Sequence, residues 1–208
     1  MTSGNGMGRQ RPDFAAIAGW INNGSSVLDL GCADGTLLRY LRQTRRITGY
    51  GVEIDDDSIL ACVKNGVNVV QSDLERGLSG FENNSFDYVV LSQTLQAMKN
   101  SEVIMREMLR VGREGIVTFP NFGYWKNRLE VLKGRMPVSE NLPYEWFDTP
   151  NVHLCAIADF ERFCEERDIR IVERKVLTHG RPVTMMPNLL GALAVYHFGN
   201  GKTVNRER

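Results

Sequence analysis

An acidic, glycine-punctuated turn follows an apolar run near the start of the chain. Residues 27–30 are apolar apart from Asp29, and Gly31 and Gly35 follow before a segment with apolar residues at helical spacing. This order predicts a strand, a tight loop and a helix start, the arrangement in which backbone amides approach a nucleotide-like ligand. Glycine lacks the Cβ atom that would obstruct the approach. Asp29 adds a negative charge at the carboxyl end of the strand, and this charge bears on which ligand fits.

Acidic residues also stand at the ends of the next two predicted strands. Glu53 lies near the end of the second strand (47–54), where a carboxylate can bind both hydroxyls of a ribose; the alternative is a solvated acidic turn. Asp73 follows the third strand and can accept an adenine amino proton, or can instead cap a turn or helix. The predicted cofactor-binding residues are Asp29, Gly31, Cys32, Ala33, Gly35, Glu53, Ile54, Asp73, Leu74, Ser92 and Gln93.

The loop favours one class of cofactor over another. The dinucleotide fingerprint G-x-G-x-x-G needs a second and a third glycine, but Ala33 and Thr36 stand in those places. Asp29 would also repel a pyrophosphate. A ligand that carries an ammonium and a sulfonium group would be attracted. We therefore predict S-adenosylmethionine, or its product S-adenosylhomocysteine, rather than a nicotinamide dinucleotide.

Strand and helix signals alternate along the chain and predict how these residues are positioned. Five βα units precede residue 120, which indicates an α/β fold with a doubly wound, mostly parallel sheet and right-handed crossovers. Two later strands, 169–177 and 190–198, complete a Rossmann-like sheet of seven strands with a C-terminal antiparallel strand. We expect one domain over 11–198, with mobile tails at 1–10 and 199–208, and a first helix capped by Asp13 and running to Ile21.

Composition excludes several classes of protein. Lys plus Arg equal Asp plus Glu at 25 each, so no overall field attracts nucleic acid or an anionic membrane. The apolar runs are too short to span a membrane, and residues 1–10 lack the apolar core of a signal peptide. The four cysteines are scattered without metal-ligand spacing. These features predict a cytoplasmic protein with reduced thiols and no metal site, nucleic-acid partner or membrane partner.

Residues 122–150 form an aromatic insertion between the fifth strand and the helix that follows. Aromatic side chains beside Arg135 and Met136 are typical of interface cores. The insertion is therefore a docking surface for a partner, a lid over a substrate, or an extra helix in ordinary packing. Its aromatic residues are Phe122, Tyr124, Trp125, Tyr144, Trp146 and Phe147.

Dedicated catalytic machinery is not indicated by the sequence. Transfer of an activated methyl group needs alignment, and a general base only where the nucleophile is protonated. His153 and Glu145 are the weak candidates for such a base, and His153 is better interpreted as a capping or core histidine before an apolar helix. No dyad or triad is visible, so the catalytic residues stay unknown.

The strand-end residues resemble the cofactor site of class I S-adenosylmethionine-dependent methyltransferases. Residues 27–35, the run SFDYVVLSQTLQ from Ser85, LPYEW at 142–146 and DTPN at 148–151 are similar to the methionine biosynthesis protein MetW family. The similarity extends over about 11–198. Ala33 departs from the glycine expected there.

The resemblance implies a protein of methionine synthesis that works with a MetX-type homoserine O-acyltransferase, as an accessory or regulatory subunit in a hetero-oligomer. The alternative is a methyltransferase that uses the same cofactor on an unknown small-molecule acceptor. The fold itself does not choose between them, because it hosts both binders and catalysts.

Overall fold

The computed structural model describes residues 11–201 of the 208-residue chain. The tail predicted at 1–10 lies outside the described residues. The tail predicted from residue 199 begins too early, because residues 199 and 200 still belong to the last strand and Gly201 donates to the Asp168 carbonyl at 2.9 Å. The remaining residues of that tail, 202–208, also lie outside the described part.

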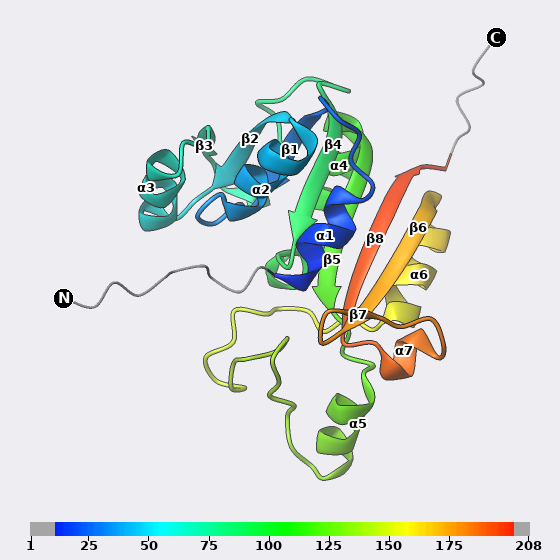
Figure 1. Ribbon diagram of the computed structural model, residues 1–208. Coiled ribbons are helices and arrows are strands. Elements are labelled where there is room, and N and C mark those ends of the chain that lie inside the picture. The colour runs from blue at the N-terminus through cyan, green and yellow to red at the C-terminus, as the bar shows by residue number, and fades with distance from the viewer. Residues whose placement is uncertain (1–10, 202–208) are drawn as a thin grey trace.

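One mixed sheet carries the fold (Figure 1). Its strand order is β3-β2-β1-β4-β5-β8-β6-β7, with the first five strands parallel and β8 antiparallel to both of its neighbours. The predicted α/β class and C-terminal antiparallel strand are confirmed, and the eighth strand is a two-residue addition. The strands are β1 (Ser26–Leu30), β2 (Thr48–Glu53), β3 (Val69–Gln71), β4 (Phe86–Ser92), β5 (Gly112–Pro120), β6 (Ile169–Thr178), β7 (Arg181–Pro182) and β8 (Leu193–Asn200).

Helices cover both faces of the sheet and bury two apolar clusters. Because side chains alternate along a strand, Val90 of β4 packs in the cluster under α1, α2 and α3, while Leu91 packs in the cluster under α4 and α6. The helices are α1 (Pro12–Ala18), α2 (Thr36–Arg45), α3 (Asp56–Lys64), α4 (Ser101–Val111), α5 (Trp125–Leu132), α6 (Ile157–Glu166) and α7 (Pro187–Leu190), with 3₁₀ turns η1 (Leu74–Arg76) and η2 (Leu95–Ala97).

The first helix differs from its prediction. It ends at Ala18 rather than Ile21, and Asp13 lies inside its first turn instead of capping it. The Asp13 side chain is fully buried and turns toward Ser92 and Thr118 at the ends of β4 and β5. A tertiary contact has therefore replaced the local capping role that the sequence suggested.

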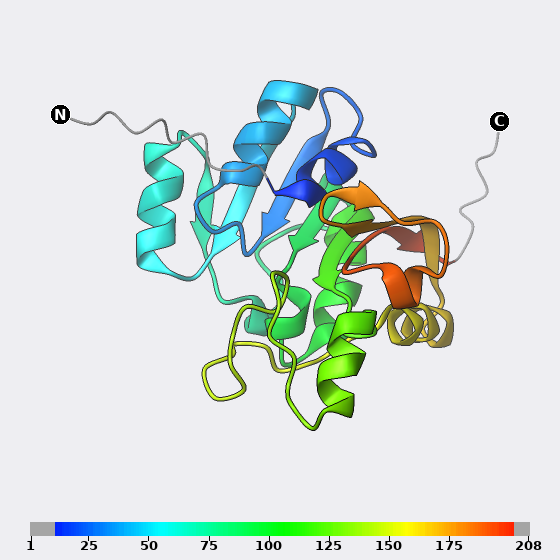
Figure 2. The ribbon, with the colours of Figure 1, turned by 60° about the horizontal axis from the view of Figure 1, so that its bottom comes forward.

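The insertion between β5 and α6 has little regular structure after α5. Only one isolated bridge, Ser139 with Leu142, occurs between α5 and α6. The segment loops outward beyond the ends of β4 and β5 (Figure 2). No helix among residues 11–201 is long and apolar enough to cross a membrane.

Candidate cofactor site

Three residues of the loop after β1 have a left-handed backbone conformation. Gly31, Ala33 and Gly35 have φ of 66°, 47° and 74°. The amides of Gly31 and Cys32 both donate to the Val52 carbonyl, at 2.8 and 3.1 Å, which ties the loop to β2. An alanine in this conformation costs roughly 1–2 kcal/mol relative to a right-handed one, so Ala33 is held there by its neighbours.

The two glycines of the loop serve packing. A Cβ atom on Gly31 would lie 2.9 Å from the Thr94 hydroxyl oxygen, and one on Gly35 would lie 2.9 Å from a methyl carbon of Val67. Side chains that follow β4 and precede β3 therefore fill the space that a Cβ atom would take at these two glycines. The approach of a ligand to the loop backbone stays a prediction.

Cys32 contributes its backbone to the loop and points its side chain inward. Its thiol packs against Gly51, and its Sγ lies 3.7 Å from the Sγ of Cys62 in α3. The Cys62 thiol donates to the Ala33 carbonyl at 2.9 Å. Burial raises the pKa of both thiols, which suits packing groups better than reactive ones. The two cysteines therefore support the loop from beneath.

Asp29 lies in a cavity of about 260 Å³ between this loop, α1 and the end of β4. Its side chain is almost wholly buried, and the described residues offer its carboxylate no hydrogen-bond donor. Burial raises its pKa to about 7, an effect that the nearby Arg11 guanidinium partly opposes. A buried carboxylate without a partner is costly in water-free surroundings. The cavity is therefore poised to accept a cationic group.

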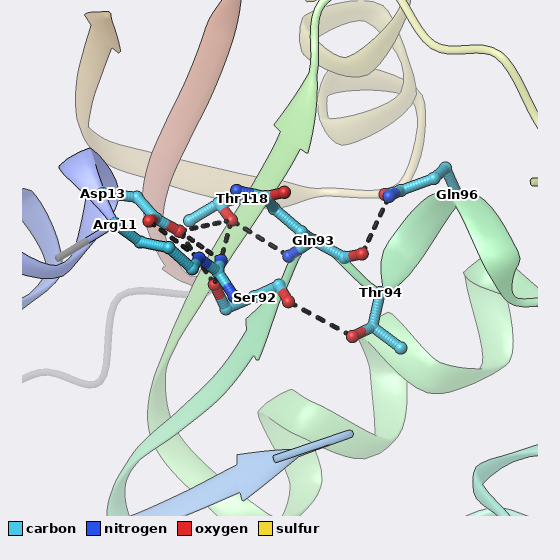
Figure 3. A network of polar contacts seen from close by, with 7 residues as sticks. All are labelled: Arg11, Asp13, Ser92, Gln93, Thr94, Gln96 and Thr118. Atoms are coloured by element: carbon cyan, nitrogen blue, oxygen red, sulfur yellow. Dashed lines mark hydrogen bonds and ion pairs between the residues drawn. The ribbon is translucent and has the colours of Figure 1, made fainter. Parts of the chain in front are cut away.

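A polar network joins Arg11 and Ser92, which both line this cavity, to Asp13 and Thr118 (Figure 3). Arg11 donates to Asp13 at 2.6 Å and to the Ser92 hydroxyl at 2.5 Å. The Ser92 hydroxyl in turn donates to Asp13 at 2.9 Å, and the Thr118 hydroxyl lies 3.3 Å from the same carboxylate. Ser92, predicted as a ligand contact, lines the cavity, but its hydroxyl group is already hydrogen-bonded within this network.

Arg11 is the functional candidate that the sequence did not reveal. Its side chain is 41% exposed, and the residue lines the Asp29 cavity. It also lines a second cavity of about 390 Å³, together with Gln93. No local pattern connects residue 11 with residue 92, because their contact forms only when α1 packs against the sheet.

Gln93 lines the second cavity and has a left-handed backbone conformation. Its φ is 56°, and its amide is held by the Thr118 carbonyl and hydroxyl at 2.9 and 3.0 Å. Its side chain lines the second cavity rather than the first. At the mouth of that cavity, Glu140 and His179 approach to 3.4 Å.

Glu53 touches the loop directly. Its carboxylate accepts the amides of Ala33, Ile54 and Asp55 at 2.9, 2.8 and 3.1 Å. A carboxylate has about four lone-pair positions, so a ribose must share or displace these contacts. The ribose role of Glu53 stays a prediction, and Ile54 lies exposed beside it.

Asp73 and Leu74 lie farther along the strand ends and do not line the Asp29 cavity. The Asp73 side chain accepts the Glu75 amide at 2.9 Å and caps η1, which is the alternative that its position left open. Leu74 packs on the core beneath. Their adenine role also stays a prediction.

The two weak catalytic candidates lie away from the Asp29 cavity. His153 is exposed, neither core nor cap, since α6 starts after Ala156; its Nε2 lies 3.2 Å from the Lys99 carbonyl. Glu145 is exposed in the insertion. Among residues 11–201, no group of three or more metal-ligating side chains comes together.

Sequence comparison assigns the family. The model of the methionine biosynthesis protein MetW matches residues 11–198. The chain belongs to the MetW family. A relative in Rhodopirellula baltica, named bifunctional methionine biosynthesis protein MetXA/MetW, is 39% identical over 171 residues, which cover 77% of this chain. This MetW-family chain spans only 27% of that relative's length.

Solved structures share the fold at low sequence identity. An S-adenosylmethionine-dependent methyltransferase from Mesorhizobium loti gives a TM-score of 0.68 at 14% identity, covering 91% of this chain and 98% of that one. A possible histamine N-methyltransferase from Thermotoga maritima gives 0.65 at 16% identity, with 92% and 88% covered. The complex of the Haloferax volcanii Trm112 methyltransferase activator with a putative methyltransferase gives 0.64 at 14%, with 91% and 89% covered. The MetW-family chain therefore has the class I methyltransferase fold.

Proposed function

We propose that this MetW-family protein binds S-adenosylmethionine or S-adenosylhomocysteine at the ends of β1, β2 and β4, and acts on a MetX-type homoserine O-acyltransferase through its aromatic insertion. It would serve as an accessory subunit of that enzyme in the cytoplasm. The observation that carries the cofactor half is the Asp29 carboxylate, which is almost wholly buried, lines the cavity and accepts no hydrogen bond from residues 11–201.

The Asp29 cavity fits the amino-acid end of the cofactor. An α-ammonium group would give Asp29 a hydrogen-bonded positive partner, and Arg11, which lines the same cavity, would offer a donor for the α-carboxylate. The volume of about 260 Å³ is below that of most complete ligand pockets. The adenosine end would therefore extend outward along Glu53, Ile54, Asp73 and Leu74.

The proposed partnership with the acyltransferase is supported by the bifunctional MetXA/MetW relative and by exposed apolar side chains. In the Rhodopirellula baltica protein, MetXA and MetW share one name and one chain. In this chain, Trp146 and Phe147 are 72% and 70% exposed and stack edge to face at 5.7 Å. Among the residues of α5, only Asn127 is buried. Exposed aromatic clusters of this kind mark protein interaction sites.

The cofactor proposal is tested by calorimetric titration of S-adenosylmethionine into purified protein at pH 8. We expect saturable binding, and a loss of at least about 100-fold in affinity for Asp29→Asn, since a charge-assisted pair in a dry site is removed. Asp57→Asn is the matched control, because Asp57 is an exposed acidic residue in the first turn of α3. Equal affinity in all three proteins would overturn the cofactor site.

The partner proposal is tested with the MetX-type acyltransferase of the same organism. We expect its activity to change when the full-length protein is added, and the change to disappear with Trp146→Ala. Tyr50→Ala is the control, because Tyr50 is an exposed aromatic residue on β2 away from the insertion. If acyltransferase activity stays constant with the protein and either cofactor form present, the partnership is refuted.

A second function, methyl transfer to a small acceptor, is favoured by the second cavity. This cavity adjoins the first at Arg11 and includes Gln93 at the end of β4, so it offers space for an acceptor beside the cofactor. The test is conversion of S-adenosylmethionine to S-adenosylhomocysteine with fractionated cell extract. We expect turnover to be lost in Glu53→Ala, and no turnover with any fraction would exclude this alternative.

A further inference from the structure

A third cavity, of about 360 Å³, is lined by residues of α5, α6, α7 and β6 (Figure 1). It shares no lining residue with the cavities beside Asp29 and Gln93. Helix α5 belongs to the aromatic insertion. The cavity therefore borders the segment that we propose for contact with the acyltransferase, and its lining indicates what kind of partner group fits there.

Accessible apolar side chains make up one part of the lining. Helix α7 and the residue before it contribute Met186, Pro187 and Leu189, and the first turn of α6 contributes Ala158. Met186 is 58% exposed, Ala158 is also exposed, and the other two are half-buried. An apolar side chain of a partner that packed here would remove this area from water.

The charged side chains of the lining leave one positive charge over. Arg174 is paired with Glu161, whose carboxylate also accepts the Tyr196 hydroxyl at 2.9 Å. Arg128 is the remaining charged residue of the lining, and its guanidinium group forms no ion pair with any residue in 11–201. The cavity therefore favours an anionic group beside the apolar one.

Arg128 is oriented by a backbone contact. Its Nε donates to the Gly123 carbonyl at 2.6 Å, which restrains the guanidinium group although the residue is exposed. The terminal amino groups of Arg128 meet no acceptor within the described part of the chain. An arginine restrained in this way can bind a carboxylate through two parallel hydrogen bonds, with less side-chain entropy to lose than a free one.

We propose that this cavity receives a segment of the MetX-type acyltransferase in which an acidic residue stands beside an apolar one. The carboxylate pairs with Arg128, and the apolar side chain packs on Met186 and Leu189. This occupant is supported by the charge of the lining, by the place of α5 in the insertion and by the relative whose name joins MetXA with MetW. The inference rests on the proposed function and adds the chemistry of the contact.

The charged half is tested by biolayer interferometry between the full-length chain and the acyltransferase of the same organism. We expect Arg128→Gln to weaken binding about tenfold at low salt, because a charge-assisted pair is removed. The loss should shrink at high salt, which screens an exposed pair. Arg46→Gln is the matched control and should bind normally, because Arg46 is an exposed arginine at the end of α2.

The apolar half is tested by Met186→Asn. Asparagine tolerates the left-handed conformation of this residue, whose φ is 47°. We expect binding to weaken about fivefold at low and at high salt alike, because burial of apolar area is not screened. Leu60→Asn on α3 is the control, since Leu60 is 56% exposed away from the cavity. Circular dichroism and thermal unfolding check the fold of each variant.

Arg128→Lys identifies the group that the partner contributes. The substitution places a primary amine at the cavity, and a carbodiimide should link this amine to an Asp or Glu of the acyltransferase. Mass spectrometry of the digested complex locates the linked pair. Arg46→Lys is the control and should give no link to the acyltransferase.

The outcomes separate this contact from the proposed function. If the unaltered chain does not bind the acyltransferase, the partnership fails and the contact fails with it. If the unaltered chain binds but Arg128→Gln binds equally well at low salt, the contact is overturned and the partnership stands. A link from residue 128 to a second copy of this chain, with none to the acyltransferase, would also overturn the contact.

Discussion

The Asp29 cavity and the aromatic insertion lie at the same end of the sheet, but they differ in how far their side chains are buried and held in place. The cavity is built from residues far apart in sequence that are buried and tied together, as in the Arg11–Asp13–Ser92 network. The insertion leaves large apolar side chains in water and is anchored mainly near its ends, for example by the Phe122 amide on the Cys155 carbonyl at 2.9 Å.

The difference teaches what each region is suited to recognise. A small charged ligand is bound well by groups that are already fixed and desolvated, because little reorganisation is then needed. A protein surface is bound by apolar area that the free chain leaves uncovered. The strongest tests of this comparison are therefore measurements of stability, in which the two regions should behave differently.

The largest expected effect is at Asp13. Asp13→Ala removes the buried acceptor of an ion pair whose Arg11 side chain is 41% exposed, and leaves Ser92 and Thr118 without that acceptor. We expect the free energy of unfolding to fall by about 1–3 kcal/mol, measured by urea denaturation. Glu145→Ala in the insertion is the control and should change it by less than about 0.5 kcal/mol. Equal small effects would contradict the contrast between the regions.

The next largest effect is the pH dependence that Asp29 gives to stability and to ligand affinity. Because its folded pKa is raised from 3.8 to about 7, the folded state holds the proton more tightly than the unfolded state. The free protein therefore becomes less stable as pH rises from about 4 to 7. Affinity for a cationic ligand runs the other way and should increase as pH rises through 7.

Asp29→Asn should remove both pH dependences. It should also stabilise the free protein at pH 8 by roughly 1–3 kcal/mol, since a desolvated charge is removed. Thermal unfolding across pH, alone and with S-adenosylmethionine, provides the measurement. Cofactor affinity that is flat between pH 6 and 8 in the unaltered protein would show that Asp29 does not meet the cation.

A smaller effect is expected at Ala33. Ala33→Gly removes the strain of an alanine in the left-handed conformation and should raise the free energy of unfolding by about 1 kcal/mol. The greater conformational entropy of glycine in the unfolded chain reduces this gain. Ala16→Gly in α1 should instead lower it by a similar amount, because glycine weakens a helix. Denaturant midpoints compare the two. A loss of stability in Ala33→Gly would mean that the methyl group packs in a way that offsets its strain.

The smallest effect is expected in the insertion. Replacing Trp146 and Phe147 together by serine should alter the free energy of unfolding by less than about 0.5 kcal/mol, because both side chains are mostly in water. A loss above 2 kcal/mol would favour the third interpretation of this segment, ordinary packing. Tyr124 already follows that interpretation, since it is buried while Trp125 beside it is partly exposed.

Much of the fold was predictable because its signals are local. The acidic turn before α3 shows this: Asp55 caps the helix through the Ser58 amide at 2.8 Å, and the helix ends before Gly66 with φ of 68°. Element bounds differed by a few residues. The two-residue β7 lies between the predicted strands 169–177 and 190–198, and the short α7 ends on Leu190, the first residue of the second of them. No local signal indicates β7, because it forms only by pairing with β6.

The sequence by itself determined the order of strands and helices, the acidic residues at the strand ends and the family, since each depends on residue type and near-neighbour spacing. Only the tertiary structure decided which of those residues share a cavity. It brought Arg11 to Ser92, placed Val67 where a Cβ atom of Gly35 would lie, and buried Asp29 in the wall of a cavity. The physical reason is that burial and hydrogen-bond partners come from residues distant in the chain, and these meet only when the helices pack on the sheet.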